Sequence, residues 1–502
     1  MVGHSTWVIC MHQRLIQRRR GQRGTGLALA ATAALLTACT MPTRHSLPTM
    51  PPLPAQWDAG QGMSSTTELS PWWLAAGDDQ LSALITEALA RNRDVARSVL
   101  RLRQAGLATR RSEQDQWPQP SLGLSAGAQR PLQNTGPSSV VINGVSVPLP
   151  ASSGTSTNAG LSLSASYELD LWGRVADSVT AADHSARASA ADLDAARWLL
   201  TTQVAEQYWT LAASDAKRPL LQAQITDAQA SLAAAQLRVD QGKARPLEAD
   251  RASAALADAR LRLQALDTQR STAQRALAVL LDVPPQQYAA PAAQLPAADP
   301  AELPAATPTA VLDRRPDLRS ARHALDAALA KLNIAEANRY PTVRLSATLG
   351  SGGNGLGQWL SNPVGSLGAA LALPMVDWER LRIERNTAQL QLDDAAVAFR
   401  DSLYRALAEV DNQLAQRQQL QAELPNVRDK LTQAGKALAV ARLRHATGAD
   451  ALQTVRDADQ ARRDAQAALL DLRLKAWLNQ VAVHKALGGP LSDARHGSVA
   501  QR

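Results

Sequence analysis

Apolar and polar side chains alternate along residues 161–171 with the period of a β-strand. Leucine, alanine and tyrosine occupy the odd-numbered positions, and serine, glutamate and aspartate occupy the even-numbered ones. Such alternation places one set on each face of a strand. Residues 121–128, 342–349 and 366–375 alternate in the same way with smaller side chains. We therefore predict four strands, each with one apolar and one polar face.

Long helices are predicted after the strands. No strand pattern occurs in the 68 residues from Arg174 to Gln241, which as one helix would extend roughly 100 Å at about 1.5 Å per residue. A shorter helix is predicted from Pro246 to about Leu281. Pro219 and Pro425 lie inside long helices, and we expect each to kink or interrupt its helix.

Heptad spacing indicates how these helices pack. In the helix after Pro246, alanine or leucine recurs every seven residues, as in a coiled-coil seam. This seam contains Ala252, Ala259, Leu266, Ala273 and Leu280, with Leu256, Leu263 and Leu277 between them. A second series contains Leu318, Leu325 and Leu332 with Ala321, Ala328 and Ala335. Coiled-coil hairpins are therefore expected.

The chain contains two copies of one pattern. Asp94 and Pro118 are matched by Asp317 and Pro341 at an offset of 223. Later positions match at an offset of 206, and these are Trp172, Arg174, Pro219, Gly242 and Pro284 with Trp378, Arg380, Pro425, Gly448 and Pro490. The two offsets differ because a turn-rich loop between residues 118 and 172 is shorter in the second copy. The duplication indicates a pseudo-twofold protomer.

Proline-rich segments divide the chain into regions. We predict a signal peptide at 1–38, a linker at 39–70, a first repeat at 71–288, a connector at 289–308, a second repeat at 309–490 and a flexible tail at 491–502. Each repeat contains a helix, a β-hairpin and a helical hairpin. The β-hairpins are expected at 120–172 and 342–376, and the helical hairpins at 174–281 and 380–487.

The strand pattern is typical of a transmembrane β-barrel, although a soluble antiparallel sheet with one wet face has the same alternation. In lipid, the two edges of a four-stranded sheet would lack hydrogen-bond partners. Several protomers must then contribute strands, and three would supply twelve, enough to surround an aqueous channel.

The N-terminus has the order of a secretory signal. Five arginines precede the apolar run from Leu27 to Ala38, which is too short to span a bilayer. Residues 36–39, Leu-Thr-Ala-Cys, resemble a bacterial lipobox, which implies acylation of Cys39; an ordinary signal peptide is the alternative. Met11 is an alternative start to Met1. Removal of the segment lowers the formal charge from +8 to +3, so the basic composition gives little support to nucleic-acid binding.

Four blocks carry a family resemblance, namely WWLAAGDDQLSALITEALARNRDV, YELDLWGRV, RRPDLRSARHALDAALAKLNIAEANRYPTVRLSATLG and ALAEVDNQL. From Trp72 to Gly489 the chain resembles the TolC-like outer-membrane efflux lipoproteins of the NodT/OprM type. One departure is LPMVDWERLR, where the family commonly has an aromatic residue and a glycine near the aspartate. This departure affects the expected local geometry at Asp377.

The resemblance implies a mixed α and β fold that assembles as a homotrimer. A twelve-stranded barrel in the outer membrane would continue into a twelve-helix periplasmic tunnel, with Trp172, Arg174, Trp378 and Arg380 at the strand-to-helix junctions. The implied partners are a periplasmic adaptor (membrane fusion protein), an inner-membrane pump of the resistance-nodulation-division (RND) class, and outer-membrane lipid through acylated Cys39. The implied location is the cell outer membrane, extending into the periplasm.

Helix-hairpin turns are expected at Gly242 and Gly448, because glycine suits the left-handed position that ends a helix and Pro246 suits the next first turn. The resemblance implies that these turns form the periplasmic tip, where adaptors dock and a ring of carboxylates narrows the tunnel. Acids six and nine positions after the second glycine are common in the family, and here these positions are Thr454 and Asp457.

Asp457 is therefore one candidate for the carboxylate ring, and the nearby acids Glu248, Asp250 and Asp450 are the others. The alternative for each acid is stabilisation of a helix start. Asp450 with Gln453 resembles a capping box.

Enzymatic chemistry finds little support in the sequence. Residues 350–355 have G-x-G-x-x-G spacing, but a strand rather than a helix is predicted next, which favours a hairpin loop. The eight histidines are scattered without His-x-x-x-His or cysteine pairing. We expect no catalytic residue, metal site or cofactor.

The predicted function is a passive exit duct for drugs or other small toxic compounds. An inner-membrane pump would supply the energy, and adaptor docking would untwist the coiled coils. Metal efflux and type I protein secretion remain alternatives, as does a periplasmic adaptor or structural coiled-coil lipoprotein.

Overall fold

The computed structural model describes residues 43–49, 52, 54, 57–58, 72–74, 76–130, 139–142, 145–148, 155–300, 307–353 and 363–488. Cys39, much of the predicted linker and the predicted tail lie outside these residues. The chain divides into two compact units, and each unit takes segments from both sequence copies. The first comprises residues 1–46, 114–178 and 331–388, and the second comprises residues 47–113, 179–330 and 389–502.

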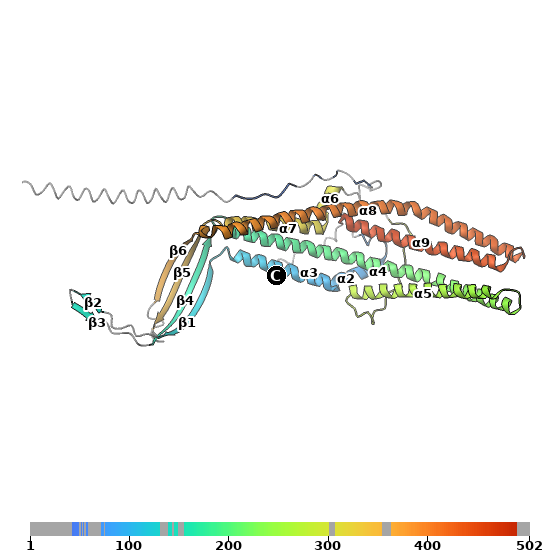
Figure 1. Ribbon diagram of the computed structural model, residues 1–502, viewed down its shortest axis with the longest axis horizontal. Helices are drawn as coiled ribbons and strands as arrows, with labels where there is room; N and C mark the ends of the chain where they lie inside the picture. The colour runs from blue at the N-terminus through green and yellow to red at the C-terminus, as the bar shows by residue number, and fades with distance from the viewer. Residues whose placement is uncertain are drawn as a thin grey trace, which may run out of the picture. The chain divides into compact units, whose positions relative to one another are not determined.

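The first unit contains a four-stranded antiparallel sheet (Figure 1). Its strands are β1 (Gln119–Gln129), β4 (Ser156–Leu169), β5 (Thr342–Gly353) and β6 (Pro363–Ala372), in the order β1-β4-β5-β6. The four predicted strands are confirmed, with β4 ending two residues before the predicted limit. Residues 350–353 of the glycine-rich stretch predicted as a hairpin loop lie in β5, and residues 354–355 lie outside the described residues.

The strand register confirms the two predicted faces. Leu122 lies opposite Leu163, which lies opposite Leu349 on the next strand. The neighbouring row crosses all four strands with small hydroxyl side chains, namely Ser121, Ser164, Thr348 and Ser366. Directly opposed residues share a face, so one face is apolar and the other polar. The apolar side chains are solvent-exposed in the single chain, with 73% for Leu122 and 90% for Leu367.

A second hairpin interrupts the segment predicted as a loop. Strands β2 (Ser139–Ile142) and β3 (Val145–Pro148) pair antiparallel. Their sequences are short but rich in valine and isoleucine, which favours strands. The expectation of an uninterrupted loop between the first two large strands is therefore wrong.

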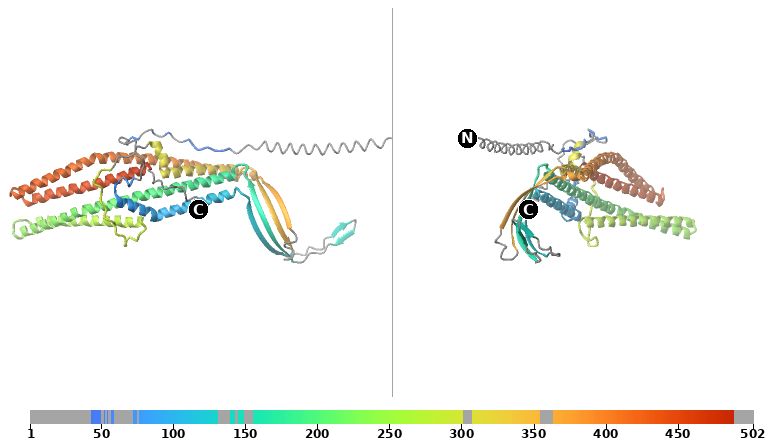
Figure 2. Two further views of the ribbon diagram at one scale, coloured as in Figure 1. Left: turned by 180° about the vertical axis from the view of Figure 1, so that it is seen from behind. Right: turned by 60° about the vertical axis from the view of Figure 1, so that its left-hand side comes forward.

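Two helical hairpins dominate the second unit (Figures 1 and 2). One joins α4 (Arg174–Asp240) to α5 (Pro246–Leu280), and the other joins α8 (Trp378–Ala446) to α9 (Leu452–Leu487). The other helices within the described residues are α2 (Asp79–Arg91), α3 (Arg93–Gln114), α6 (Pro308–Arg314) and α7 (Pro316–Ala337). A 3-10 turn at Pro374–Asp377 belongs to the first unit. Within the described residues, no helix has the length and hydropathy needed to cross a bilayer.

The long helices continue through their prolines. Pro219 lies inside α4 and Pro425 lies inside α8, and neither helix is interrupted. The predicted helix lengths are confirmed to within a residue or two. A proline removes one backbone hydrogen bond, but a helix this long retains many others and its tertiary packing.

The predicted heptad seams form the helix contacts. On α5 the buried side chains include Leu256, Ala259, Leu266, Ala273 and Leu277. On α7 the heptad leucines Leu318, Leu325 and Leu332 are almost completely buried. Alanine at several seam positions lets the helices approach closely, which accounts for a core with few aromatic residues over most of its length.

Aromatic residues are concentrated in one part of the second unit. Trp209 of α4 lies 5.2 Å from Trp477 of α9 and 6.2 Å from Trp72, measured between ring centroids. Tyr208 is also fully buried and donates a hydrogen bond to Asp78 Oδ2 at 2.9 Å. Asp78 in turn caps α2 through its other carboxylate oxygen. This cluster connects α2 with one helix of each hairpin.

Candidate functional site

The two hairpin turns have the same backbone geometry. Gly242 and Gly448 have φ values of +67° and +76°. Lys243 N–H donates to Arg238 O at 2.7 Å, and Ala449 N–H donates to Arg444 O at 2.8 Å. Each glycine N–H also donates to the carbonyl three residues earlier, which completes a Schellman motif. The predicted left-handed glycines are confirmed in both copies.

The helices after the turns start in different ways. Pro246 is the first residue of α5, as predicted, with Arg245 as its N-cap. Helix α9 starts at Leu452 after the N-cap Ala451, with no side-chain cap. The Asp450 carboxylate instead pairs with Arg444 Nε at 3.1 Å across the turn. The capping-box interpretation of Asp450 with Gln453 is therefore wrong.

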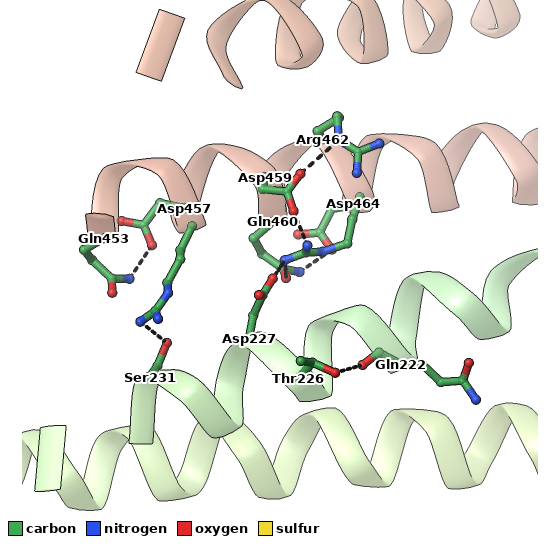
Figure 3. Close-up of polar contacts among 12 residues, drawn as sticks. Gln222, Thr226, Asp227, Ser231, Gln453, Asp457, Asp459, Gln460, Arg462 and Asp464 are labelled. Atoms are coloured by element: carbon green, nitrogen blue, oxygen red, sulfur yellow. Dashed lines mark hydrogen bonds and ion pairs between the residues drawn. The ribbon is translucent and has the colours of Figure 1, made fainter. Parts of the chain in front are cut away.

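The other candidate acids face solvent. Glu248 pairs with Arg238 across the first turn at 3.2 Å. Asp457 is exposed and accepts a hydrogen bond from Gln453 Nε2 at 2.7 Å (Figure 3). Asp250 is exposed near the start of α5. In a single chain these acids are thus divided between the two hairpins rather than gathered in one cluster.

Contacts between α4 and α9 join the two hairpins near their turns. Arg463 Nη2 lies 2.6 Å from Asp227 Oδ2 on α4, and the same guanidinium contacts Asp459 on its own helix (Figure 3). Closer to the turns, Arg456 Nη1 donates to Ser231 Oγ at 3.1 Å. Arg463 is only 6% exposed, so its charge is largely removed from solvent between two carboxylates.

A third contact extends this row away from the turns. Lys217 of α4 contacts Asp471 of α9. Along the row, residue numbers rise on α4 while they fall on α9, so the two helices run antiparallel. This interface was not predicted, although Asp459 and Arg463 have the i, i+4 spacing of a helical ion pair. Nothing in local spacing identifies Asp227 as the partner on the other hairpin.

The first strand-to-helix junction is tightly bonded. Trp172 Nε1 donates to Pro341 O at 2.6 Å, and its ring lies 5.1 Å from that of Tyr340. Arg174, the first residue of α4, pairs with Glu168 of β4 at 2.7 Å. The Asp170 carboxylate accepts hydrogen bonds from the N–H groups of Val175 and Ala176, which explains why β4 ends before it.

A buried acid lies just inside this junction. Asp177 is 8% exposed in the first turn of α4. Burial raises its pKa, and the neighbouring Asp170 charge raises it further, while Arg44 opposes the shift. Gly173, which precedes the helix, has a φ of +80°, a conformation that favours glycine.

The second junction is more open. Trp378 is 61% exposed and lies 5.2 Å below the guanidinium carbon of Arg382. Arg380 bonds to Asp377 at 2.6 Å and to Glu384 at 2.9 Å. The two tryptophans are equivalent in sequence, but among the described residues a partner across the sheet end is found for the first alone. The difference lies at LPMVDWERLR, where the sequence departs from the expected pattern.

One group of potential metal ligands occurs within the described residues. His184 of α4 and His323 and Asp326 of α7 have ligand atoms within 4.8 Å of one another. The expectation that the histidines are scattered is wrong for this pair. The only local signal was the i, i+3 spacing of His323 and Asp326, which places both on one face of α7.

The chain was compared with known proteins. The family model described as "outer membrane efflux protein" matches residues 84–282 and 307–489. The pyoverdine export outer membrane protein OpmQ of Pseudomonas aeruginosa is 30% identical over 94% of this chain and 98% of its own length. The cation efflux system protein CusC of Escherichia coli K12 is 24% identical over 91% of this chain and 97% of its own length.

A solved structure shows the same architecture. The open state of the MtrE outer membrane channel of Neisseria gonorrhoeae has a TM-score of 0.74 and 26% sequence identity. The match covers 90% of this chain and 98% of that chain.

Proposed function

The chain belongs to the outer membrane efflux protein family, and on this premise we propose that it is the outer-membrane exit duct of a tripartite efflux system. It would passively transmit drugs or other small toxic compounds delivered by an inner-membrane RND pump and a periplasmic adaptor. Residues 71–288 and 309–490 would be the two repeats of the duct protomer.

The observation that carries this proposal is the pair of sheet edges. β1 and β6 each have one neighbour among the described strands. All three pairings are antiparallel, so β6 runs opposite to β1. The free edge of β6 in one copy is therefore suited to antiparallel pairing with β1 of the next. Three copies would close a barrel of twelve strands, with the leucine rows toward lipid and the hydroxyl rows toward water.

Closure would occur at the hairpin turns. We infer that the turns at Gly242 and Gly448 form the periplasmic tip and contact the adaptor. Both glycines are surrounded by open space, so the turns are accessible to a partner. Repetition of Asp457 around a threefold axis would place like charges about the opening, with Asp450, Glu248 and Asp250 as further candidates. Such a ring narrows a pore electrostatically and favours cations.

Opening would separate the two hairpins of each protomer. The Arg463 contacts to Asp227 and Asp459 and the Lys217 contact to Asp471 hold α4 against α9. Adaptor docking at the tips would supply the free energy that breaks these pairs, because a ligand shifts a conformational equilibrium only by its differential affinity.

The location follows from the same premise. The family is an outer-membrane family, and acylation of Cys39 would add a lipid anchor. The lipidated terminus would supplement the barrel. Replacement of Cys39 by serine, followed by mass measurement of the mature N-terminus, tests the anchor separately from the duct.

The decisive experiment is accumulation of a fluorescent efflux dye in a deletion strain, with and without the gene restored. Higher dye in the deletion, reversed by the intact gene, supports small-molecule efflux. The mass of the detergent-purified complex supplies an independent check, and three copies of the 53.4 kDa chain, less the signal segment, are expected. A monomer with normal dye export would contradict the edge-pairing mechanism.

Metal ions are a second candidate cargo because CusC, a cation efflux protein, is among the relatives. Growth of the deletion strain in graded concentrations of transition-metal salts distinguishes this cargo. Metal sensitivity with unchanged dye accumulation would favour metal export over drug export.

A further inference from the structure

We propose that His184, His323 and Asp326 form a binding site for a divalent transition-metal ion that joins α4 to α7. The proposal concerns a resident ion and does not depend on what the duct transports. It rests on the position of three ligand atoms from two helices that are far apart in sequence.

The distance between the imidazoles fits metal coordination. Nδ1 of His184 lies 3.4 Å from Nδ1 of His323. Two imidazole nitrogens bound to zinc at about 2.0–2.1 Å with a tetrahedral angle are about 3.4 Å apart. That distance is long for a direct hydrogen bond between the two rings. The distance between the two nitrogens therefore fits coordination of one shared metal ion better than a direct hydrogen bond.

The third ligand comes from the same turn of α7 as His323. Oδ2 of Asp326 lies 3.9 Å from Nδ1 of His184, and all three ligand atoms lie within 4.8 Å of one another. A small rotation of the carboxylate would bring this oxygen into coordination. Two histidines and one carboxylate leave a fourth position for water, a donor set that zinc and copper accept.

The arginines around the site are each paired with an acid. Arg187 pairs with Asp183 at 2.9 Å, and Arg319 pairs with Asp194 at 2.8 Å. Arg322 lies 3.5 Å from Asp326 Oδ1, the oxygen not directed at His184. Burial lowers the pKa of His323, the neighbouring His184, Arg187 and Arg319 lower it further, and Asp326 opposes the shift. Neutral imidazole is the form that binds metal.

The two sequence copies differ at the three ligand positions, which indicates that the fold does not need these ligands for packing. The position equivalent to His184 is Leu390, and those equivalent to His323 and Asp326 are Leu100 and Arg103. None of these three residues is a metal ligand. Leu390 and Leu100 are 68% and 56% exposed on their helices, so the repeated fold accepts leucine at both positions. The histidine pair is thus specific to one copy.

The test measures metal binding to the full-length protein in detergent, purified without a histidine tag and stripped with a chelator. Equilibrium dialysis against Zn²⁺ at pH 7.5 is expected to give one tightly bound ion per chain. His184→Leu and His323→Leu are each expected to weaken this binding at least tenfold, because each removes one of three ligands. Asp326→Asn is expected to weaken it less than tenfold.

The matched control is His445→Leu, which removes a histidine from the exposed second hairpin turn. It is expected to leave Zn²⁺ binding unchanged. With Cu²⁺ in place of Zn²⁺, electron paramagnetic resonance should show coupling to imidazole nitrogen in the parent protein and its loss in the double variant His184→Leu, His323→Leu.

A stability measurement detects the same site without counting ions. Zn²⁺ should raise the thermal midpoint of the parent protein and of His445→Leu, but not that of the double variant, because a ligand stabilises only the state that binds it. Equal Zn²⁺ stoichiometry and affinity in the parent and the double variant would overturn the proposal.

Discussion

Asn92 and Arg315 make the same contact in the two copies of the repeat. Asn92 Nδ2 donates to Leu280 O and Arg315 Nη1 donates to Ala486 O, each at 3.0 Å. The two donors are 223 residues apart and the two acceptors 206 apart, as the offsets of the duplication require. In both copies a side chain before a short helix therefore binds the end of a helical hairpin.

The two copies differ in the charge that this contact carries. Arg315 also pairs with Glu409 and Asp317, each at 2.8 Å, while its side chain is only 10% exposed. Burial of the Asp317 carboxyl opposes its ionisation. The hydrogen bonds and charge of Arg315 outweigh this effect and lower the pKa of Asp317. Asn92 is neutral and uses its oxygen to cap α3.

Arg315→Met should therefore destabilise the protein more than Asn92→Ala. The first removes a buried guanidinium that bonds to two partly exposed carboxylates and to a backbone carbonyl, at a cost of about 2–3 kcal/mol. The second removes a helix cap and one hydrogen bond, at a cost of about 1–2 kcal/mol. Denaturant unfolding followed by tryptophan fluorescence compares the variants. Equal midpoints would show that the buried charge network adds nothing to the shared contact.

Gly488→Ala should be more damaging than Gly242→Ala. Both glycines have a φ of +67°, where alanine costs about 1–2 kcal/mol. At Gly488 a Cβ would also lie 2.8 Å from Arg315 N, whereas at Gly242 it would meet nothing within 4 Å. The thermal midpoint should fall at least twice as far for Gly488→Ala. Equal decreases would indicate that the chain near Arg315 moves aside freely.

The protein should lose stability as the pH falls from about 6.5 to about 4. Burial, assisted by the charge of Arg417, lowers the pKa of His484 to about 4. Between that value and about 6.5 the unfolded chain binds a proton that the folded chain does not, so stability falls by up to about 1.4 kcal/mol per pH unit. Unfolding midpoints between pH 4 and 7.5 measure the slope.

His484→Phe should flatten this slope because phenylalanine retains the stacking against Trp72 without titrating. His445→Phe, at the exposed second turn, is the matched control and should leave the slope unchanged. An unaltered slope in His484→Phe would assign the pH dependence to other groups.

Asp457→Ala and Asp457→Asn should both raise single-channel conductance in planar bilayers if charge at this position helps to close the tip. Asparagine retains an oxygen for the hydrogen bond from Gln453 and removes only the charge. An increase in both variants indicates electrostatic closure. Unchanged conductance in both would reduce Asp457 to a helix-stabilising role.

Arg463→Gln should raise the single-channel conductance above that of the Asp457 variants, because it weakens the contact between α4 and α9. A double-mutant cycle with Asp227→Asn measures the coupling directly, since only interacting residues have non-additive effects. Additive effects on conductance would show that the two residues do not act as a pair in gating.

Strands, helix contacts and turns were predictable from the sequence where a pattern within one element specifies them. The strands were predicted because alternation fixes both the strand and its face, and the heptad leucines of α5 and α7 were predicted by the same logic. The glycine turns were predicted because each has a conformational requirement that glycine meets.

Contacts between distant segments were not predictable in this way. Arg463 and Asp227 are separated by 236 residues, and His184 and His323 by 139, so no local spacing pairs them. Asp450 was misassigned because a capping box requires the helix to begin beside it, and the helix begins at Leu452 while Arg444 binds the carboxylate. The hairpin of β2 and β3 was missed although Asn143-Gly144 in the sequence between them is a recognised turn signal.

Each protomer has two edge strands, β1 and β6. A protomer with a mutation in one edge strand can therefore still pair with a neighbouring protomer through the other. Every protomer contributes both of its edges to a head-to-tail ring. In a cell that makes wild-type and mutant chains in equal amounts, random mixing would give roughly one trimer in eight without a mutant chain. Edge-strand alleles should therefore be dominant over the wild type, whereas alleles that prevent folding should be recessive.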